Sequence, residues 1–477
     1  MELEYDHVVV GGGTAGCVLA NRLSADKSRS VLLLEAGPRD NYAWVHIPVG
    51  YLYCIGNPRA DWCFTTEAET GLNGRTLGYP RGRVLGGCSS INGMIYMRGQ
   101  ARDYDLWRQM GCEGWGWDDV LPLFKASEDW HAGPDEMHGT GGEWRVEPAR
   151  LSWDILEAFR EAAAQYGIPK IEDFNRGDNE GSSFFKVNQK RGVRWNAVKA
   201  FLKPAKDRAN LVVRTGAQVK RLVVEEGRAV GVVFEADGET IEVRCRREIV
   251  LSAGSIGSPH ILELSGIGRG EVLSKAGIPV LHEMDQVGEN LQDHLQLRCA
   301  YKVSGIRTLN ERANSLLGKA AIALEYLAAR SGPMSMAPSQ LGVFTRSDPS
   351  FETANIQYHV QPLSLDKFGE ALHPFPAFTA SVCNLRPTSR GEVRIKGPDT
   401  DTHPSIRLNY LTTEEDQRVA VDAIRLTRKI AAARALARFE PEEFRPGAAL
   451  QDEADLVRAA GDIGTTIFHP VGTCKMG

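Results

Sequence analysis

Two periods of apolar and polar residues occur along the chain, and each predicts one kind of element. Residues 5–10 and 30–34 are short apolar runs rich in β-branched side chains, which is typical of buried strands. Between them, residues 17–23 carry apolar side chains at helical spacing. The N-terminus therefore predicts a strand, a helix and a second strand, in that order.

Later segments carry a different combination of patterns. Residues 355–360 and 391–396 alternate apolar and polar side chains at period two, as half-buried strands do. Residues 413–436 predict a long amphipathic helix that opens with acidic residues and is rich in arginine. Strands followed by helices that cover one face predict an antiparallel sheet with helices on its back.

The turn after the first strand contains glycines at the spacing that a dinucleotide site needs. Gly11, Gly13 and Gly16 form a GxGxxG motif. The first glycine allows a tight turn, the second lets the backbone approach a pyrophosphate, and the third lets the helix pack on the strand. Glu35 ends the second strand nineteen residues after Gly16, where its carboxylate can accept hydrogen bonds from a ribose 2′-hydroxyl.

This unit predicts a bound dinucleotide. Glu35 disfavours NADP, because its carboxylate would repel a 2′-phosphate. The motif by itself does not separate NAD from FAD, and a tight turn without any ligand is the alternative.

Composition excludes several classes of protein. Of the 477 residues, 42% are hydrophobic and 25% are charged, which excludes a disordered or fibrous chain. The length predicts about three structural units or one large split domain. The formal net charge of −5, from 56 basic and 61 acidic residues, is too near neutral for a surface that follows phosphates. We therefore expect no nucleic-acid partner.

Cysteine usage and hydropathy point to a cytoplasmic location. The nine cysteines are scattered and form no CxxC pair, which suits a reducing compartment and disfavours a disulfide framework or a zinc site. We expect no metal. Residues 316–329 are helix-like, but Lys319 and Glu325 prevent them from serving as a transmembrane span. Peripheral contact with a membrane stays open.

A second glycine-rich segment, residues 80–96, lies far from the first turn. Its consecutive small residues let main-chain N–H groups approach a flat or anionic ligand closely. From the residues alone, it predicts a second loop that faces a ligand.

This segment resembles a known family, the glucose–methanol–choline (GMC) flavin oxidoreductases, in its bacterial choline and alcohol dehydrogenase-like branch. The following residues are in register with the first signature of the family: Gly86, Gly87, Ser89, Asn92, Tyr96, Gly99 and Asp105. Cys88 departs from the Gly, Ser or Thr usual there, but its size is close to that of serine, so we expect the loop to keep its shape. Residues 254–268, 287–294 and 468–477 resemble further blocks, so the resemblance covers essentially the whole chain.

The resemblance implies an α/β fold in which a Rossmann-like FAD-binding domain is interleaved with an α+β substrate domain, an antiparallel sheet backed by helices. It places residues 1–160, 196–300 and 455–477 in the FAD-binding domain. The substrate domain then comprises residues 161–195 and 301–454.

The resemblance also implies FAD as the cofactor, with Glu35 on the adenosine ribose and Val219 beside the adenine. The residues expected to contact FAD are Gly11, Gly13, Thr14, Ala15, Gly16, Glu35, Ala36, Arg83, Gly86, Gly87, Ser90, Asn92, Gly93, Met94, Ile95, Val219 and Ala253.

His469 is the candidate catalytic base. Oxidation of an alcohol moves a hydroxyl proton to a base, and histidine, with an unperturbed pKa of about 6.5, suits that task. In the family, the histidine of this block faces the flavin, which implies transfer of a hydride from the carbinol carbon to flavin N5. The alternative is that His469 merely caps the turn before Pro470. The electron acceptor is expected to be oxygen or a quinone-type compound, with a dehydrogenase preferred over an oxidase.

Other histidines receive weaker interpretations. In the family, a second His or Asn, a few tens of residues further along, pairs with the histidine of this block. The chain ends at Gly477, so we expect it to be part of a longer protein that contains this partner. His294 and His359 are predicted to be structural, and His131 and His138 to lie in a solvated loop.

The substrate prediction depends on Gln340. Choline-oxidising members of the family carry a glutamate at this place, and a neutral Gln340 lacks the charge that favours recognition of a cation. We therefore expect an uncharged primary alcohol, aliphatic or aromatic, that enters past Met334, Met336 and Phe344. The alternatives are choline dehydrogenase-like activity, a flavin-containing hydroxynitrile lyase without net redox chemistry, and a flavoprotein that turns nothing over.

Overall fold

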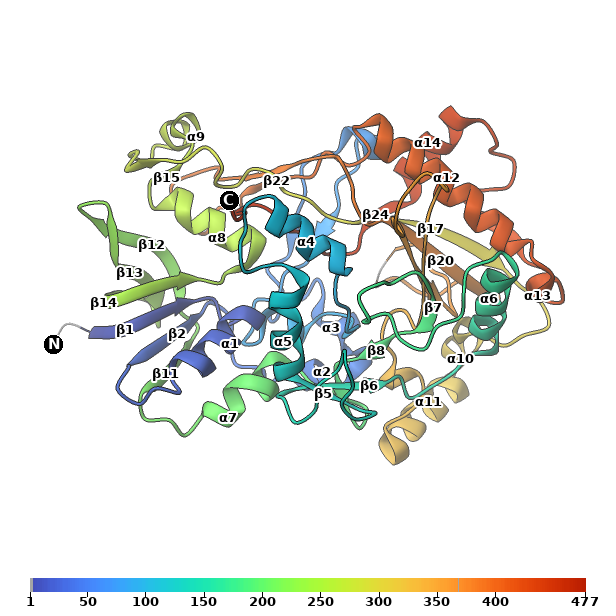
Figure 1. Cartoon of the computed structure of the whole chain (residues 1–477), viewed down its shortest axis with the longest axis horizontal. Coiled ribbons are helices and arrows are strands. Elements are labelled where there is room, and N and C mark those ends of the chain that lie inside the picture. The colour runs from blue at the N-terminus through green and yellow to red at the C-terminus, as the bar shows by residue number, and fades with distance from the viewer. Residues whose placement is uncertain (1–2, 368) are drawn as a thin grey trace.

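The computed structural model describes residues 3–367 and 369–477 and contains two main β-sheets that lie at opposite ends of the long axis (Figure 1). The first sheet has six strands. Its order is β11 (Leu211–Thr215), β2 (Val31–Glu35), β1 (Leu3–Val10), β14 (Glu239–Leu251), β13 (Arg228–Ala236) and β12 (Gln218–Glu225). The first four strands are parallel, and β13 and β12 extend the sheet as antiparallel hairpins.

Helices cover both faces of this sheet, which explains why its inner strands are apolar throughout. Val9 and Leu33 pack with α1 (Thr14–Leu23) and with the π-helical turn Val198–Leu202. Val8 and Leu32 point the other way, into a cluster that includes Ile261 of α8 (Gly254–Leu264). The predicted strand, helix and strand at the N-terminus are thus confirmed.

The second sheet has seven strands, all paired antiparallel. Its order is β23 (Glu442–Arg445), β17 (Leu295–Lys302), β20 (Ala377–Asn384), β19 (Ile356–Gln361), β18 (Leu341–Thr345) and β7 (Gly181–Phe184), and β24 (Gly464–Thr466) also pairs with the start of β17.

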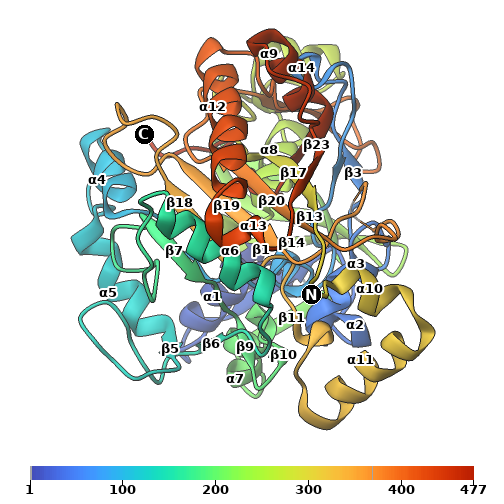
Figure 2. The ribbon, with the colours of Figure 1, turned by 90° about the vertical axis from the view of Figure 1, so that its right-hand side faces the viewer.

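One face of the second sheet is covered by helices α6 (Asp154–Gln165) and α12 (Glu414–Ala431), which lie in front of it in Figure 2. Tyr358 points to this side, where its hydroxyl is 3.0 Å from Thr427 Oγ1. Because side chains alternate along a strand, His359 faces the opposite side, toward the first domain. The predicted fold class, with an antiparallel sheet backed by helices, is confirmed. The domain boundaries remain a prediction.

The predicted helix over residues 413–436 forms, but it ends at Ala431, and α13 (Arg434–Ala437) follows as a separate turn. The other helices are α2 (Ala43–His46), α3 (Tyr51–Cys54), α4 (Ala101–Gln109), α5 (Trp117–Ser127), α7 (Lys203–Ala205), α9 (Gly270–Lys275), α10 (Leu309–Asn314), α11 (Leu316–Ala329) and α14 (Glu453–Ile463). Within the described residues, none of the helices is both long and apolar enough to cross a bilayer.

Short strands complete the connections between the two sheets. They are β3 (Phe64–Thr65), β4 (Gly78–Tyr79), β5 (Glu128–Trp130), β6 (Trp144–Pro148), β8 (Lys186–Val187), β9 (Gln189–Lys190), β10 (Val193–Arg194), β15 (Ile267–Gly268), β16 (His282–Glu283), β21 (Glu392–Arg394) and β22 (Ser405–Arg407).

A buried ion pair joins α8 of the first domain to β21. Arg394 Nη1 lies 3.1 Å from Glu263 Oε1, and Glu263 is fully buried. The backbone N–H of Ile395 donates to the other carboxylate oxygen at 2.7 Å. Burial raises the pKa of Glu263, and these two partners oppose that rise. The pair therefore holds two segments that are distant in the sequence against each other.

Replacing Glu263 with alanine is expected to lower the free energy of unfolding by about 1–3 kcal/mol. The buried Ile395 N–H loses its acceptor, and Arg394, which keeps Glu289 and Glu392, loses one of its three carboxylates. The exposed Glu239 provides the control, and Glu239→Ala should change stability by no more than about 0.5 kcal/mol. Thermal unfolding of both variants measures the difference. Equal midpoints for the two variants would contradict the assignment.

Candidate active site

A cavity of about 750 Å³ opens at the carboxyl ends of β1 and β2, the usual place for a ligand in a parallel α/β sheet. It is lined by both glycine-rich loops, by the start of α8, by Trp62 and Phe64, and by residues 470–474. Its volume is within the range of sites for small molecules and cofactors.

The two glycine-rich loops pack directly on each other. Gly86 N–H donates to the Gly12 carbonyl at 2.7 Å. A Cβ on Gly87 would lie 2.7 Å from the Gly13 Cα, and a Cβ on Gly11 would lie 2.7 Å from the Ser252 carbonyl oxygen. Only glycine fits at these contacts, and the result is a cradle of bare backbone along the cavity. Such a cradle fits the pyrophosphate of a dinucleotide such as FAD.

Glu35 closes one end of this cradle, where β2 ends. Its two carboxylate oxygens accept the N–H groups of Gly12 and Gly37, each at 2.8 Å. Burial raises the pKa of Glu35 to about 7, although both N–H donors act against that rise. The carboxylate is thus fixed in the cavity wall, as a ribose-binding group has to be.

The structure brings nine of the residues predicted to bind the cofactor together around this cavity. They are Gly11, Gly13, Thr14, Ala15, Glu35, Ala36, Gly87, Val219 and Ala253. Cys88 lines it too, and its sulfur accepts the Gly82 N–H at 3.4 Å.

The other predicted residues are not part of the cavity lining; they are Gly16, Arg83, Gly86, Ser90, Asn92, Gly93, Met94 and Ile95. Several of them hold the second loop in place. Ser90 Oγ donates to the Leu85 carbonyl at 2.8 Å, and Asn92 Oδ1 accepts from Arg194 at 2.9 Å.

The C-terminal segment brings His469 to the end of the cavity. Pro470 and Thr473 belong to its lining. Ser255 Oγ donates to the Pro470 carbonyl at 2.5 Å, and Thr473 Oγ1 donates to the Ser255 carbonyl at 2.6 Å. His469 therefore lies where the cavity meets the second sheet.

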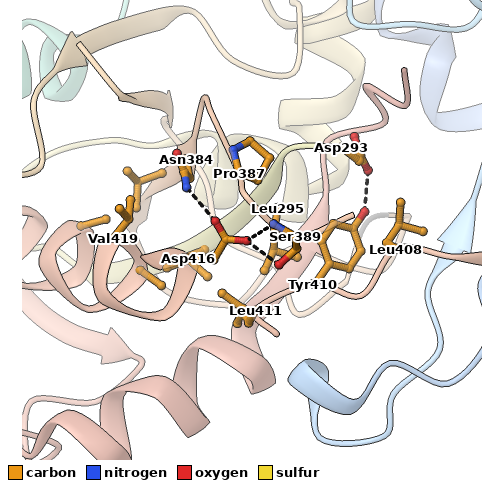
Figure 3. A pocket seen from close by; sticks show the side chains of 14 residues that line it. Asp293, Leu295, Asn384, Pro387, Ser389, Leu408, Tyr410, Leu411, Asp416 and Val419 are labelled. Atoms are coloured by element: carbon orange, nitrogen blue, oxygen red, sulfur yellow. Dashed lines mark hydrogen bonds between the residues drawn. The ribbon is translucent and has the colours of Figure 1, made fainter. Parts of the chain in front are cut away.

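A buried carboxylate, Asp293, fixes the backbone of His469. Asp293 Oδ1 accepts the N–H of His469 at 2.7 Å and that of His294 at 2.9 Å. Its Oδ2 accepts the hydroxyls of Tyr79 at 3.0 Å and of Thr466 and Tyr410 at 2.5 Å each; Figure 3 shows the bond to Tyr410. The pKa values of Tyr79 and Tyr410 are raised, first by burial and then by this charge, so both phenols stay protonated donors.

Figure 3 shows that Asp293 also borders a small pocket between β17, β20 and α12. That pocket has a volume of about 30 Å³ and is lined mainly by apolar side chains. It has room for about one water molecule, so it is no substrate site.

His469 and His294 form a hydrogen-bonded pair, with 3.3 Å between their Nδ1 atoms. His294 Nε2 lies 3.1 Å from the Leu385 carbonyl oxygen, which can only accept, so this nitrogen carries a proton. In the neutral ring, His294 Nδ1 is then the acceptor, and His469 Nδ1 is the donor. The Nε2 of His469 is left with a free lone pair.

Enclosure by the surrounding protein keeps both rings neutral, although His469 is still open to solvent and His294 is half-buried. It lowers the pKa of His469 to about 4, with the neighbouring His294 as the second cause, and it also lowers the pKa of His294. At neutral pH, His469 can therefore accept a proton at Nε2.

The sequence did not reveal the pairing of these histidines. His294 was expected to be only structural, and it lies 175 residues from His469. No role is predicted for Asp293 from the sequence. One sequence signal points to both residues. Residues 287–294, one of the blocks that resemble the family, end with an acid followed directly by a histidine.

The expectation of a solvated loop is wrong for His138. Its ring is buried, with Nδ1 3.0 Å from Glu128 and Nε2 3.0 Å from Asp173, and Trp130 stacks on it.

Comparison with known proteins gives a consistent result over the whole chain. A family model described as GMC oxidoreductase matches residues 5–296, and a second one of the same description matches residues 387–477. An oxygen-dependent choline dehydrogenase of Photobacterium profundum is 38% identical over 485 residues, which is 100% of this chain and 84% of the relative. An alcohol dehydrogenase (acceptor) of Pseudomonas putida is 37% identical over 479 residues, 99% of this chain and 86% of the relative.

A solved structure, pyridoxine 4-oxidase from Mesorbium loti, superimposes with a TM-score of 0.89 at 33% identity. The match covers 99% of this chain and 89% of that chain.

Replacing Asp293 with alanine is expected to lower the free energy of unfolding by at least about 3 kcal/mol, because three hydroxyls and two N–H groups lose a buried charged acceptor. Asp293→Asn, which keeps one acceptor oxygen, should lie between the alanine variant and the parent protein. Thermal unfolding measures both, with the exposed Asp285, as Asp285→Ala, for control. If Asp293→Ala is as stable as this control, Asp293 does not hold the site together.

Proposed function

The chain belongs to the GMC oxidoreductase family, and from this premise we propose that it oxidises a primary alcohol to the aldehyde with His469 as the base. The protein is an FAD-dependent oxidoreductase that acts on CH–OH donors. The family, the cofactor and the enzyme class predicted from the sequence are thereby confirmed.

The observation that carries the proposal is the free lone pair on His469 Nε2. Hydrogen bonds link the Leu385 carbonyl to His294 and His294 to His469, and they leave Nε2 of His469 as an acceptor. His469 lies at the place where the cofactor cavity meets the second sheet. A hydroxyl that donates to it can transfer its proton as the C–H bond breaks. FAD, when bound, supplies the acceptor for the hydride of the carbinol carbon.

The charge that His469 gains in this step is balanced nearby. The Asp293 carboxylate accepts the backbone N–H of His469 and acts to raise the pKa of its ring, against the lowering by burial. The protonated ring is thus stabilised by a fixed negative charge, while the neutral ring is favoured at rest.

The lining of the cavity supports the proposed cofactor residues. The bare backbone at Gly11, Gly13 and Gly87 would hold the pyrophosphate, and Glu35 would accept from the adenosine ribose. Val219, in the wall on the β12 side, would contact the adenine. The electron acceptor is proposed to be oxygen or a quinone-type compound, and reoxidation of the reduced enzyme by each of them separates the two.

Glu35→Gln is expected to weaken FAD binding by about 10- to 100-fold, because one of the two buried acceptor oxygens becomes an NH2 group that faces a backbone N–H donor. Titration of the apoprotein with FAD, followed by flavin fluorescence, measures the dissociation constant. The exposed control Glu239→Gln should bind FAD like the parent. Unchanged affinity in Glu35→Gln would remove Glu35 from the cofactor site.

The test of the reaction is anaerobic addition of primary alcohols to the FAD-loaded protein, followed by visible absorption. A dehydrogenase or oxidase bleaches the flavin band, whereas a lyase leaves it oxidised. His469→Ala should slow the bleaching by at least about 100-fold while FAD stays bound, the usual scale for loss of a general base. His282→Ala, at an exposed histidine, should bleach at the parent rate.

The same experiment predicts the pH dependence. Because the pKa of His469 is lowered to about 4, the ring is neutral and active above that pH. The bleaching rate should be flat between about pH 6 and 8 and should fall about tenfold per pH unit below pH 4. A rate that already halves near pH 6.5 would show an unperturbed histidine and contradict this environment.

A further inference from the structure

A row of polar side chains crosses the face of the second sheet that is turned toward the first domain. Arg298 of β17 is paired with Ser381 of β20, and Ser381 is paired with His359 of β19. Residues directly opposite each other on neighbouring strands share one face of a sheet. The three side chains therefore lie side by side.

The neighbours of Arg298 show which face this is. Leu297 and Cys299 point into the apolar core beneath α12, and so do the neighbours of His359, Tyr358 and Val360. Since side chains alternate, Arg298 and His359 point to the opposite side. The pKa of His359 is lowered to about 3, mainly by burial and then by His469 and His294. His294 contacts the Leu385 carbonyl directly after β20, so the histidine pair lies at one end of the strand that carries Ser381.

All three side chains have a buried polar atom without a partner. Within residues 3–367 and 369–477, no hydrogen-bond partner lies near Arg298 Nη2, Ser381 Oγ or His359 Nε2. Arg394 shows the contrast, because its guanidinium contacts Glu263, Glu289 and Glu392. Arg298 is half-buried and its enclosed Nη2 lacks an acceptor. An enclosed cationic N–H without an acceptor is costly, and the carboxylate of a ligand would supply the missing partner.

A second arginine near Arg298 adds to the positive charge on this face of the sheet. Arg445 of β23 is paired with Ala300 of β17, on the same face as Arg298. Burial and the charge of Arg445 lower the pKa of Arg298 to about 10, so it stays a cation at neutral pH. Asp366, the nearby carboxylate, is bonded to Arg445 and His373.

We propose that Arg298 binds a carboxylate carried by the alcohol substrate, so that the enzyme prefers a primary alcohol with an acid group at its far end. Two strand spacings, about 10 Å, separate the backbones of His359 and Arg298. The hydroxyl then meets His469, and the carboxylate accepts from Arg298 and Ser381. The proposal rests on the proposed function and replaces the uncharged alcohol expected from Gln340.

The fork of Arg298 suits this ligand, because a planar guanidinium donates two parallel N–H groups to a carboxylate. The same charge disfavours a quaternary ammonium such as choline. Gln340 is neutral and buried, and its amide nitrogen already donates to the Ala337 carbonyl, so it offers no compensating negative charge.

The experiment compares matched alcohols in the FAD-loaded full chain. 4-(Hydroxymethyl)benzoate is set against its methyl ester, and 6-hydroxyhexanoate against 1-hexanol. The parent should show a kcat/KM at least about 30-fold higher for each acid than for its neutral match. Arg298→Met should remove this preference, Arg298→Lys should keep part of it, and Arg425→Met, at an exposed arginine of α12, should leave it unchanged.

A second readout needs no turnover. 4-Methylbenzoate lacks the hydroxyl, so its dissociation constant, measured by calorimetry, reports only on the acid-binding site. It should bind the parent and Arg425→Met equally, and Arg298→Met at least about 30-fold more weakly.

The outcomes separate the two proposals. Two results would overturn the role of Arg298 and leave the oxidation standing, provided that alcohols bleach the flavin. One is an equal kcat/KM for the hydroxy acids and their neutral matches, and the other is an Arg298→Met variant that retains the preference for the hydroxy acids. If no alcohol bleaches the flavin, the proposed oxidation fails, and the affinity of Arg298→Met for 4-methylbenzoate still decides the site. Equal affinity in parent and variant overturns it.

Discussion

The Asp293 carboxylate is the contact on which the active-site geometry depends. It is buried, and a buried negative charge has to be satisfied by donors that come to it. Five donors do so: one is the N–H of the adjacent His294, and the other four come from β4, from the segment before α12 and from residues 466–469. These segments are far apart in the sequence, so this one requirement brings the C-terminal histidine to the second sheet.

The two faces of the second sheet have different roles: one contributes to stability, and the other carries the polar side chains of the site. One face is apolar and packs against α6 and α12, which gives the sheet its rigidity. The other face carries His359, Ser381 and Arg298 in one row. Rigid strands hold such groups at fixed spacings, which a loop would not do.

The electrostatics of the site follow from burial. Both histidines of the pair are kept neutral, so the proton acceptor is ready at neutral pH. Arg298 stays charged but has no carboxylate partner among the residues that the structure describes. A site built of neutral bases and one unpaired cation is suited to an alcohol that brings its own negative charge.

The sequence alone determined the local features of this protein. The apolar runs specified β1 and β2, the glycines specified the turn between β1 and α1, Glu35 was placed by its distance from that turn, and His469 was found in a motif. All of these depend on residues close together in the chain, where side-chain period and backbone freedom act directly.

Only the tertiary structure decided the partners. His294 and His469 meet across 175 residues, Asp293 collects donors from three distant segments, and Arg298 becomes a site residue through strand register. Period-two alternation predicts that a strand has two faces, but it does not say which face meets the cofactor domain or which strand lies next to it. Long-range strand pairing determines both, because only the arrangement that satisfies all the buried polar groups at once is stable.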